Sequence, residues 1–114
     1  MIIAVPVTAD DRVAYGWGRA PRVALAAAAD GAISTWQVHD VGWDMLHDEG
    51  TEGAHHARVV RFLKDNEVEA VTAERMGDPM VRTLDSMGIP VVLGATGDAR
   101  TCVLAALAVV SGTA

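Results

Sequence analysis

The chain has 114 residues and a mass of 11.9 kDa, the size of one domain, and we expect a single domain over residues 1–114. Its formal net charge is −6, which argues against a nucleic-acid-binding protein, because such a protein normally presents a basic face. The longest unbroken apolar run, residues 102–110, is far shorter than the roughly 20 residues that cross a bilayer, so no membrane is expected as a partner. The first residues show no signal peptide, and we expect a cytoplasmic protein.

The chain contains one cysteine, Cys102. A single cysteine excludes an internal disulfide and an all-cysteine iron–sulfur or zinc site within one chain.

The predicted elements begin with an apolar run over residues 2–7, which is typical of a central β-strand. A second strand is predicted over residues 22–29, and the Asp30-Gly31 pair that follows it is a strong hairpin signal. Residues 32–40 alternate between apolar and polar side chains, which indicates a third strand with one solvent-facing side. The first three strands are therefore expected to have short connections and antiparallel or mixed pairing.

The second half of the chain alternates helical and strand patterns. Helical spacing predicts a helix over residues 55–66, whose stripe facing the sheet is expected to contain His56, Val59, Val60 and Leu63. Two more strands and two more helices follow: strands over residues 69–73 and 89–93, and helices over residues 79–87 and 98–110. The order β-β-β-α-β-α-β-α predicts an α/β fold with a five-stranded mixed sheet, in the ribonuclease-H-like three-layer arrangement.

The helix predicted over residues 98–110 is apolar on almost every side. Such a helix has to be covered on both faces or has to pair with another chain. A homodimer through this helix is therefore one partner arrangement that the sequence suggests. Cys102 lies within the helix, and we expect it to be a structural thiol rather than a ligand.

A ribonuclease-H-like topology raises the question of nuclease activity. Two-metal phosphodiester hydrolysis requires several carboxylates around two divalent ions roughly 4 Å apart. The strand predicted over residues 2–7 contains no acid, and Asp10 and Asp11 lie beyond its end. The strand predicted over residues 69–73 offers only Glu69, at its start. We therefore expect no nuclease or hydrolase activity.

Residues 39–57 carry nearly all of the charge imbalance, with five acids, no lysine or arginine, and all four histidines of the chain. His55 and His56 are adjacent at the start of a predicted helix. Consecutive helical positions lie about 100° apart, so both rings bind one metal only if His55 still lies in the preceding loop. A helix N-terminus disfavours imidazolium and leaves a neutral imidazole, which suits iron, zinc or an iron–sulfur cluster. The alternative is a polar pair that caps the helix beside an acidic loop.

His47 lies in a segment, residues 43–49, that alternates large apolar residues with acids. The segment suits a lid or a partner-docking surface, and its carboxylates are also candidate oxygen ligands for a divalent ion. A solvated loop is the simpler interpretation. His39 ends a predicted strand on its polar side and is expected to be exposed.

Two glycine-containing loops are candidates for contacts with an anionic cofactor. The run Gly16-Trp17-Gly18-Arg19 combines exposed backbone amides with a directional cation, although Trp17 equally suits packing over the sheet edge. Gly77 lies between a predicted strand and a helix N-terminus, a place where anions bind. Neither loop is a Walker motif or a dinucleotide fingerprint.

Several segments occur together, and in the same order, in a known family. They are Ile-Ala-Val-Pro-Val near the start, Gly-Arg-Ala-Pro at 18–21, the Asp-Gly hairpin, residues 57–63, the strand–Gly77–helix unit, and Gly-Ile-Pro-Val-Val-Leu-Gly-Ala-Thr-Gly at 88–97. Through these segments, most of the chain resembles the dinitrogenase iron–molybdenum cofactor biosynthesis family.

The resemblance implies a small ribonuclease-H-like domain with no enzymatic activity of its own. It also implies an iron-containing cluster as cofactor, an iron–molybdenum or iron–sulfur precursor, and a cluster donor or acceptor protein as partner, as for accessory proteins of nitrogen fixation. The expected metal ligands are His56, His55 and His47, and the expected cofactor contacts are Trp17, Gly18, Arg19 and Gly77. The cluster is expected to bind in a mouth formed by the loops at 15–19, 47–56 and 74–77. The other hypothesis is a cofactor-free protein-interaction or regulatory module on the same fold.

The chain departs from the family pattern at three places. Residues 16–18, Gly-Trp-Gly, replace the usual His-Phe-Gly triplet, so the aromatic residue is kept and the histidine is lost. The histidines of the family's central loop are moved to the helix start at 55–56, and Glu-Arg at 74–75 replaces a Gly-Gly pair. Each change weakens the expected cluster pocket, so the cluster hypothesis depends chiefly on His56.

Overall fold

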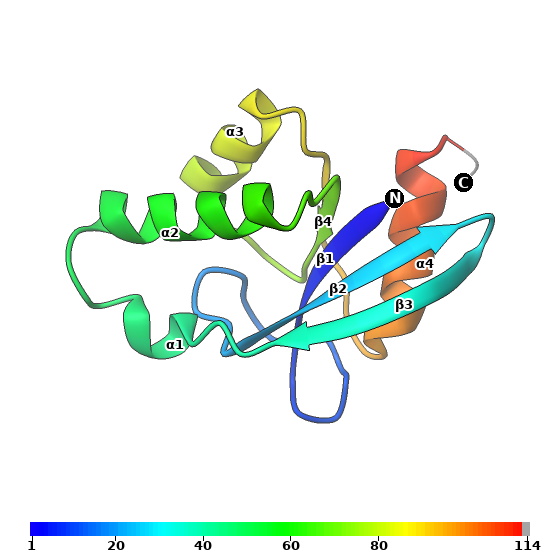
Figure 1. Ribbon diagram of the computed structural model, residues 1–114, viewed down its shortest axis with the longest axis horizontal. Helices are drawn as coiled ribbons and strands as arrows, with labels where there is room; N and C mark the ends of the chain where they lie inside the picture. The colour runs from blue at the N-terminus through cyan, green and yellow to red at the C-terminus, as the bar shows by residue number, and fades with distance from the viewer. Residues whose placement is uncertain (113–114) are drawn as a thin grey trace.

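The computed structural model describes residues 1–112, which form three layers around one five-stranded sheet (Figure 1). The strands are β1 Ile2–Val7, β2 Arg22–Ala29, β3 Ala32–His39, β4 Ala70–Thr72 and β5 Val91–Val92. The helices are α1 Trp43–Leu46, α2 Glu52–Asp65, α3 Asp78–Ser86 and α4 Ala99–Val110. The α/β class and the ribonuclease-H-like order are confirmed, with α1 as an additional element.

The strand order across the sheet is β3-β2-β1-β4-β5. β2 pairs antiparallel with both β1 and β3, and β4 pairs parallel with both β1 and β5. The β2–β3 hairpin turns at Asp30 and Gly31, whose φ angles of 53° and 75° suit a tight turn. Because β1 and β4 are parallel, the loops that follow their carboxyl ends emerge at the same edge of the sheet, where β3 also ends.

The two faces of the sheet carry separate apolar cores. Successive residues of β1 alternate between them: Ala4 packs with α2 and α3, while Ile3 and Val5 pack with α4. Figure 1 shows α2 and α3, in green and yellow, on one side of the sheet, and α4, in orange and red, behind it. Both faces of the central strands are therefore buried.

The alanine-rich sequence of β2 explains how closely α4 can pack. Ala24, Ala26 and Ala28 belong to the α4-side core, as do Ala99 and Val103 of the helix. Small side chains on both surfaces let α4 approach β2 closely. The outer face of the helix stays open, since Val109 is 53% exposed.

The structure corrects several predicted boundaries. Residues 43–49, for which a solvated loop was the simpler interpretation, contain the helix α1, and α2 begins at Glu52 rather than at residue 55. Thr51 caps α2 by accepting a hydrogen bond from the Ala54 backbone N–H at 3.0 Å, which starts the helix earlier. β4 and β5 are shorter than predicted, at three and two residues.

The structure also bears on His39, on Cys102 and on the expected absence of a membrane-spanning segment. His39 is half-buried rather than exposed, because its ring packs edge-on against Phe62 with the centroids 5.5 Å apart. Cys102 is half-buried in α4, with Sγ 3.2 Å from the Thr96 carbonyl oxygen. Within residues 1–112, no helix combines the length and apolar character needed to span a bilayer.

Candidate functional site

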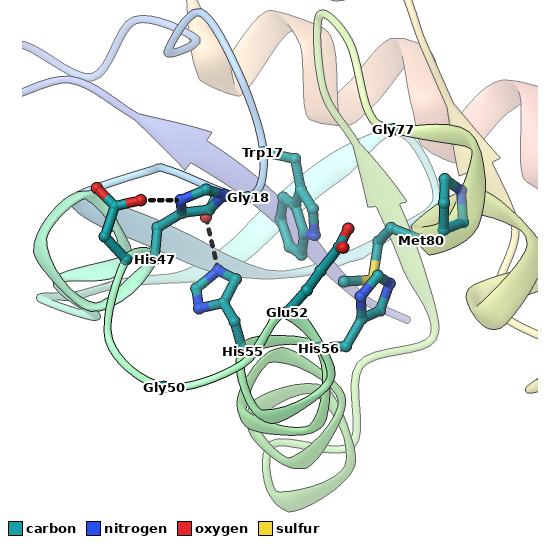
Figure 2. Close-up of a pocket in the computed structure, with 11 residues that line it drawn as sticks. Trp17, Gly18, His47, Gly50, Glu52, His55, His56, Gly77 and Met80 are labelled. Carbon is teal, nitrogen blue, oxygen red and sulfur yellow. Dashed lines mark hydrogen bonds and ion pairs between the residues drawn. The ribbon is translucent and has the colours of Figure 1, made fainter.

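A cavity of about 580 Å³ opens where the loops after β1, α1 and β4 meet the start of α2 (Figure 2). It is called the histidine cavity below, and its lining residues are Trp17, Gly18, His47, Asp48, Gly50, Glu52, His55, His56, Gly77, Pro79 and Met80. The structure thus brings together every predicted site residue except Arg19, which lines an adjoining cavity.

Two buried tryptophans hold the loops that form the histidine cavity. Trp17 and Trp43 are 1% and 2% exposed, and their rings meet edge to face with the centroids 5.2 Å apart. Trp43 also meets the Phe62 ring of α2 at 5.6 Å, and its backbone N–H donates to the Ala20 carbonyl oxygen at 3.1 Å. Trp17 therefore both packs in the core, as one interpretation held, and forms part of the cavity wall.

The ring of His55 is held by hydrogen bonds at both nitrogens. Nε2 lies 2.8 Å from the Gly18 carbonyl oxygen, and Nδ1 lies 2.8 Å from Nη1 of Arg58. A carbonyl oxygen only accepts and a guanidinium only donates, so Nε2 carries the hydrogen and Nδ1 accepts. Arg58 Nη1 also donates to the Leu46 carbonyl oxygen at 3.2 Å. This chain of bonds joins the loop after β1 to α2 and to the end of α1.

His55, not His56, lies on the buried stripe of α2. The predicted stripe is wrong on this point: the buried residues of the helix are His55, Val59 and Leu63, while His56 and Val60 are half-buried. His55 precedes Val59 by four residues and His56 precedes it by three. Residues three or four apart are neighbours on a helix, so the sequence pattern alone allows either histidine on the buried stripe. The hydrogen bonds of His55 to Gly18 and Arg58 stabilise the arrangement in which His55 is the buried histidine.

His56 presents an imidazole nitrogen without a partner. Its Nε2 is shielded from solvent and, among residues 1–112, has no hydrogen-bond partner. Figure 2 shows the ring beside Glu52 and Met80, which come from the start of α2 and from α3. Glu52 precedes His56 by four residues and so lies on the same helix face. A nitrogen, a thioether sulfur and a carboxylate therefore border one part of the cavity.

His47 lies at the other end of the cavity, in the turn after α1. Its Nδ1 lies 3.0 Å from Oδ1 of Asp48. This hydrogen bond lowers the pKa of the Asp48 carboxyl, and the charges of His47 and Arg19 act in the same direction. The His47 and His55 rings meet edge to face at 5.2 Å. Within residues 1–112, no group of three or more His, Cys, Asp and Glu side chains is arranged to hold a metal ion.

A second cavity of about 480 Å³ lies beside the first, with Trp17, Gly18 and Gly77 bordering both. It is called the arginine cavity below, and it is lined by residues 14–21 and 75–77. Arg19 and Arg75 are its charged residues, and none of its lining residues is acidic.

Three cavity residues were not singled out from the sequence: Met80, Glu52 and Arg75. Glu52 and Arg75 do lie within the loops at 47–56 and 74–77 that were expected to form the site. Met80 was expected only as an apolar residue of its helix, and it is indeed 6% exposed. Glu52 was predicted to lie in a loop, where a spacing of four residues from His56 does not place two side chains together. Because α2 begins at Glu52, the two residues share one helix face. Arg75 has no local signal, because its neighbour Tyr15 lies 60 residues earlier in the chain.

Comparison with known proteins places the chain in a family. The model of the dinitrogenase iron-molybdenum cofactor family matches residues 1–109. The chain belongs to this family. The resemblance carried by Gly-Arg-Ala-Pro at 18–21 and by residues 88–97 is therefore confirmed, and the family name links the chain to a cofactor-related class of small proteins. No curated protein matches the sequence.

Solved structures similar to this member of the dinitrogenase iron-molybdenum cofactor family share its fold over nearly its whole length. The crystal structure of PH0822 superposes with a TM-score of 0.72 at 22% identity, covering 98% of this chain and 92% of that chain. The NMR structure of a candidate NifB protein from Thermotoga, of the DUF35 family, has a TM-score of 0.67 at 20% identity and coverages of 98% and 89%. The apo form of the orange protein from Desulfovibrio gigas has a TM-score of 0.66 at 21% identity and coverages of 98% and 88%.

Proposed function

We propose that this chain is a non-enzymatic binding or carrier protein for an iron-containing metallocluster, an iron–molybdenum or iron–sulfur cofactor precursor. It would take the cluster from a donor protein and pass it to an acceptor protein. Membership of the family supports the class of cofactor. The observation that carries the proposal is the ring of His56, which lies in the wall of the histidine cavity and whose Nε2 has no hydrogen-bond partner within residues 1–112.

The residues around the cavity fit such a group. His56 offers a nitrogen that has already lost its water, so a bond to iron would satisfy it without further desolvation of the ring. Met80 adds a soft sulfur atom, and Gly18 and Gly77 leave backbone groups accessible to a bulky cluster. His47 is the supporting ligand, because His55 would have to give up a hydrogen bond before it could bind metal.

A small number of protein ligands is what a carrier protein requires, because the cluster has to be released again. A structural metal site encloses its ion with four protein ligands. Among the described residues, the histidine cavity offers the imidazole of His56, whose Nε2 has no hydrogen-bond partner, and that of His47, whose Nδ1 is hydrogen-bonded to Asp48. A cluster held at so few points dissociates readily when an acceptor offers more ligands. The apo protein keeps its fold because both apolar cores form without the cluster.

The test is anaerobic reconstitution with iron and sulfide, or with a preformed cluster, followed by visible absorption. We expect the wild type to take up the cluster and His56→Ala to lose most of this uptake, with a smaller loss for His47→Ala. His39→Ala is the matched control, since His39 lies outside the histidine cavity.

Two outcomes contradict the proposal. Equal uptake by the wild type, His56→Ala and His47→Ala would remove these histidines from the site. No uptake by the wild type, under conditions that load another family member, would favour the second hypothesis, a cofactor-free interaction module. One observation supports that module: Met45 on α1 is 78% exposed beside the acids Asp44 and Asp48.

We also propose that α4 mediates a homodimer. Its outer residue Val109 is 53% exposed, and the neighbouring Leu93 is 47% exposed. Light scattering after size-exclusion chromatography should give the mass of a dimer for the wild type and that of a monomer for Val109→Asp, because a buried unpaired charge opposes association. A wild type that stays monomeric at high concentration contradicts the homodimer.

A further inference from the structure

We propose that the arginine cavity binds an oxygen-rich anion, a carboxylate or a tetrahedral oxyanion, through the guanidinium groups of Arg19 and Arg75 and the indole N–H of Trp17. The inference goes beyond the proposed function, because a free anion would bind here without a cluster in the neighbouring cavity. A carboxylate and a tetrahedral oxyanion share one feature, namely two or more negatively charged oxygen atoms bonded to one central atom.

The first support is charge. The chain as a whole has a net charge of −6, yet the arginine cavity is lined by two arginines and by no acid. Among residues 1–112, neither Arg19 nor Arg75 takes part in an ion pair. Two unpaired guanidinium groups around one concave surface attract an anion, and each presents N–H donors in a fixed plane that matches carboxylate and oxyanion oxygens.

The second support is independent of charge and comes from Trp17. Its side chain is 1% exposed, and its indole Nε1–H has no hydrogen-bond partner among residues 1–112. A buried N–H without an acceptor costs free energy, so such groups are almost always paired in folded proteins. Indole nitrogen is a donor only, and therefore the missing partner is an acceptor. Trp17 borders both cavities, and an oxygen bound at their shared boundary would supply that acceptor.

The third support is the placement of Arg75. Its guanidinium lies over the Tyr15 ring, 5.1 Å from the centroid, and Nη1 donates a hydrogen bond to the Tyr15 hydroxyl oxygen. Tyr15 is itself 70% exposed and lines the cavity, so the pair stands at its rim. Stacking fixes the plane of the guanidinium in advance, which lowers the conformational entropy lost when an anion binds.

The start of α3 adds backbone donors at the boundary of the two cavities. Gly77 is the N-cap of this nine-residue helix and makes no side-chain cap hydrogen bond. Pro79 has no backbone N–H, so the first-turn donors that lack intrahelical partners are the N–H groups of Asp78 and Met80. Asp78 follows in the first turn but lines neither cavity. A helix N-terminus beside two arginines favours an anion over a neutral ligand.

The experiment is a titration of the apo protein, labelled with ¹⁵N, with molybdate, sulfate, phosphate or citrate at constant ionic strength. The indole N–H resonance of Trp17, assigned with Trp17→Phe, should shift and saturate. Arg75→Ala and Arg19→Ala should each weaken binding by about tenfold, since hydrogen bonds to charged groups are the strong ones. Arg61→Ala is the matched control, because Arg61 is exposed on α2 outside both cavities. Strongest binding of citrate would identify a carboxylate ligand, and strongest binding of molybdate, sulfate or phosphate a tetrahedral oxyanion.

The proposal is overturned if no anion gives a saturable shift, or if chloride competes as well as the oxygen-rich anions do. It is also overturned if the double variant Arg19→Ala, Arg75→Ala binds like Arg61→Ala. Failure here is distinguishable from failure of the carrier function, which is read out by cluster uptake in His56→Ala. An anion that binds a protein unable to take up a cluster would separate the two directly.

Discussion

Replacing Trp43 with alanine should lower the free energy of unfolding by about 3–5 kcal/mol, the usual cost of removing a buried tryptophan. Trp43 is 2% exposed and contacts three other rings, those of Trp17, Phe62 and His55. α1 has only four residues, too few to be stable without this anchor. Denaturation in urea, followed by circular dichroism, measures the change.

Met45→Ala is the control for Trp43→Ala. Met45 lies in the same helix and is 78% exposed, so its removal should change the free energy of unfolding by less than about 0.5 kcal/mol. Trp43→Phe keeps an aromatic ring and should fall between the two variants. Similar losses in Trp43→Ala and Met45→Ala would contradict the assigned role of Trp43 as the anchor of α1.

The second large effect is expected at His55 and Arg58. His55→Ala leaves the Gly18 carbonyl oxygen and the Arg58 guanidinium each short of one hydrogen bond. Arg58→Ala leaves His55 Nδ1 without its donor, while the Leu46 carbonyl oxygen keeps its hydrogen bond from the Glu49 backbone N–H. Each substitution should cost about 1–3 kcal/mol, because a buried polar group is left unpaired. Urea denaturation of both single variants and of the double variant measures these losses.

The double variant should lose less stability than the sum of the single losses. Both residues act through one hydrogen-bonded chain, so the coupling energy should reach about 0.5–3 kcal/mol. Arg61→Ala, an exposed arginine one helical turn further on, should cost almost nothing and serves as the control. Strictly additive losses would show that His55 and Arg58 do not act together. His56→Ala should leave stability nearly unchanged, in contrast to His55→Ala.

Strands β1 and β2 were predictable from the sequence because burial on both faces leaves continuous apolar runs. Residues 2–7 and 22–29 were placed with the observed bounds, since β1 and β2 lie between two apolar layers. The beginning of α2 was not predictable in the same way. Glu52, Gly53 and Ala54 show no apolar period, and only the cap formed by Thr51 stabilises a helix there.

The site was predictable in its parts but not in its internal contacts. The loops containing Trp17, His56 and Gly77 were expected to meet, and all three residues line one cavity. Which histidine turns inward depends on the Gly18 carbonyl oxygen, 37 residues away in the sequence. A local pattern contains no information about such a distant acceptor, so His56 was predicted on the buried stripe of α2 in place of His55, while Val59 and Leu63 were predicted correctly.

The separation of the two cores by the sheet also bears on how this protein can change during evolution. Neither the histidine cavity nor the arginine cavity contains a residue of α4. Substitutions on the outer surface of α4 are therefore expected to act independently of both cavities, because distant sites with no shared contacts behave additively. The residues on that surface, and any contacts made there, can therefore change while the lining of both cavities stays the same.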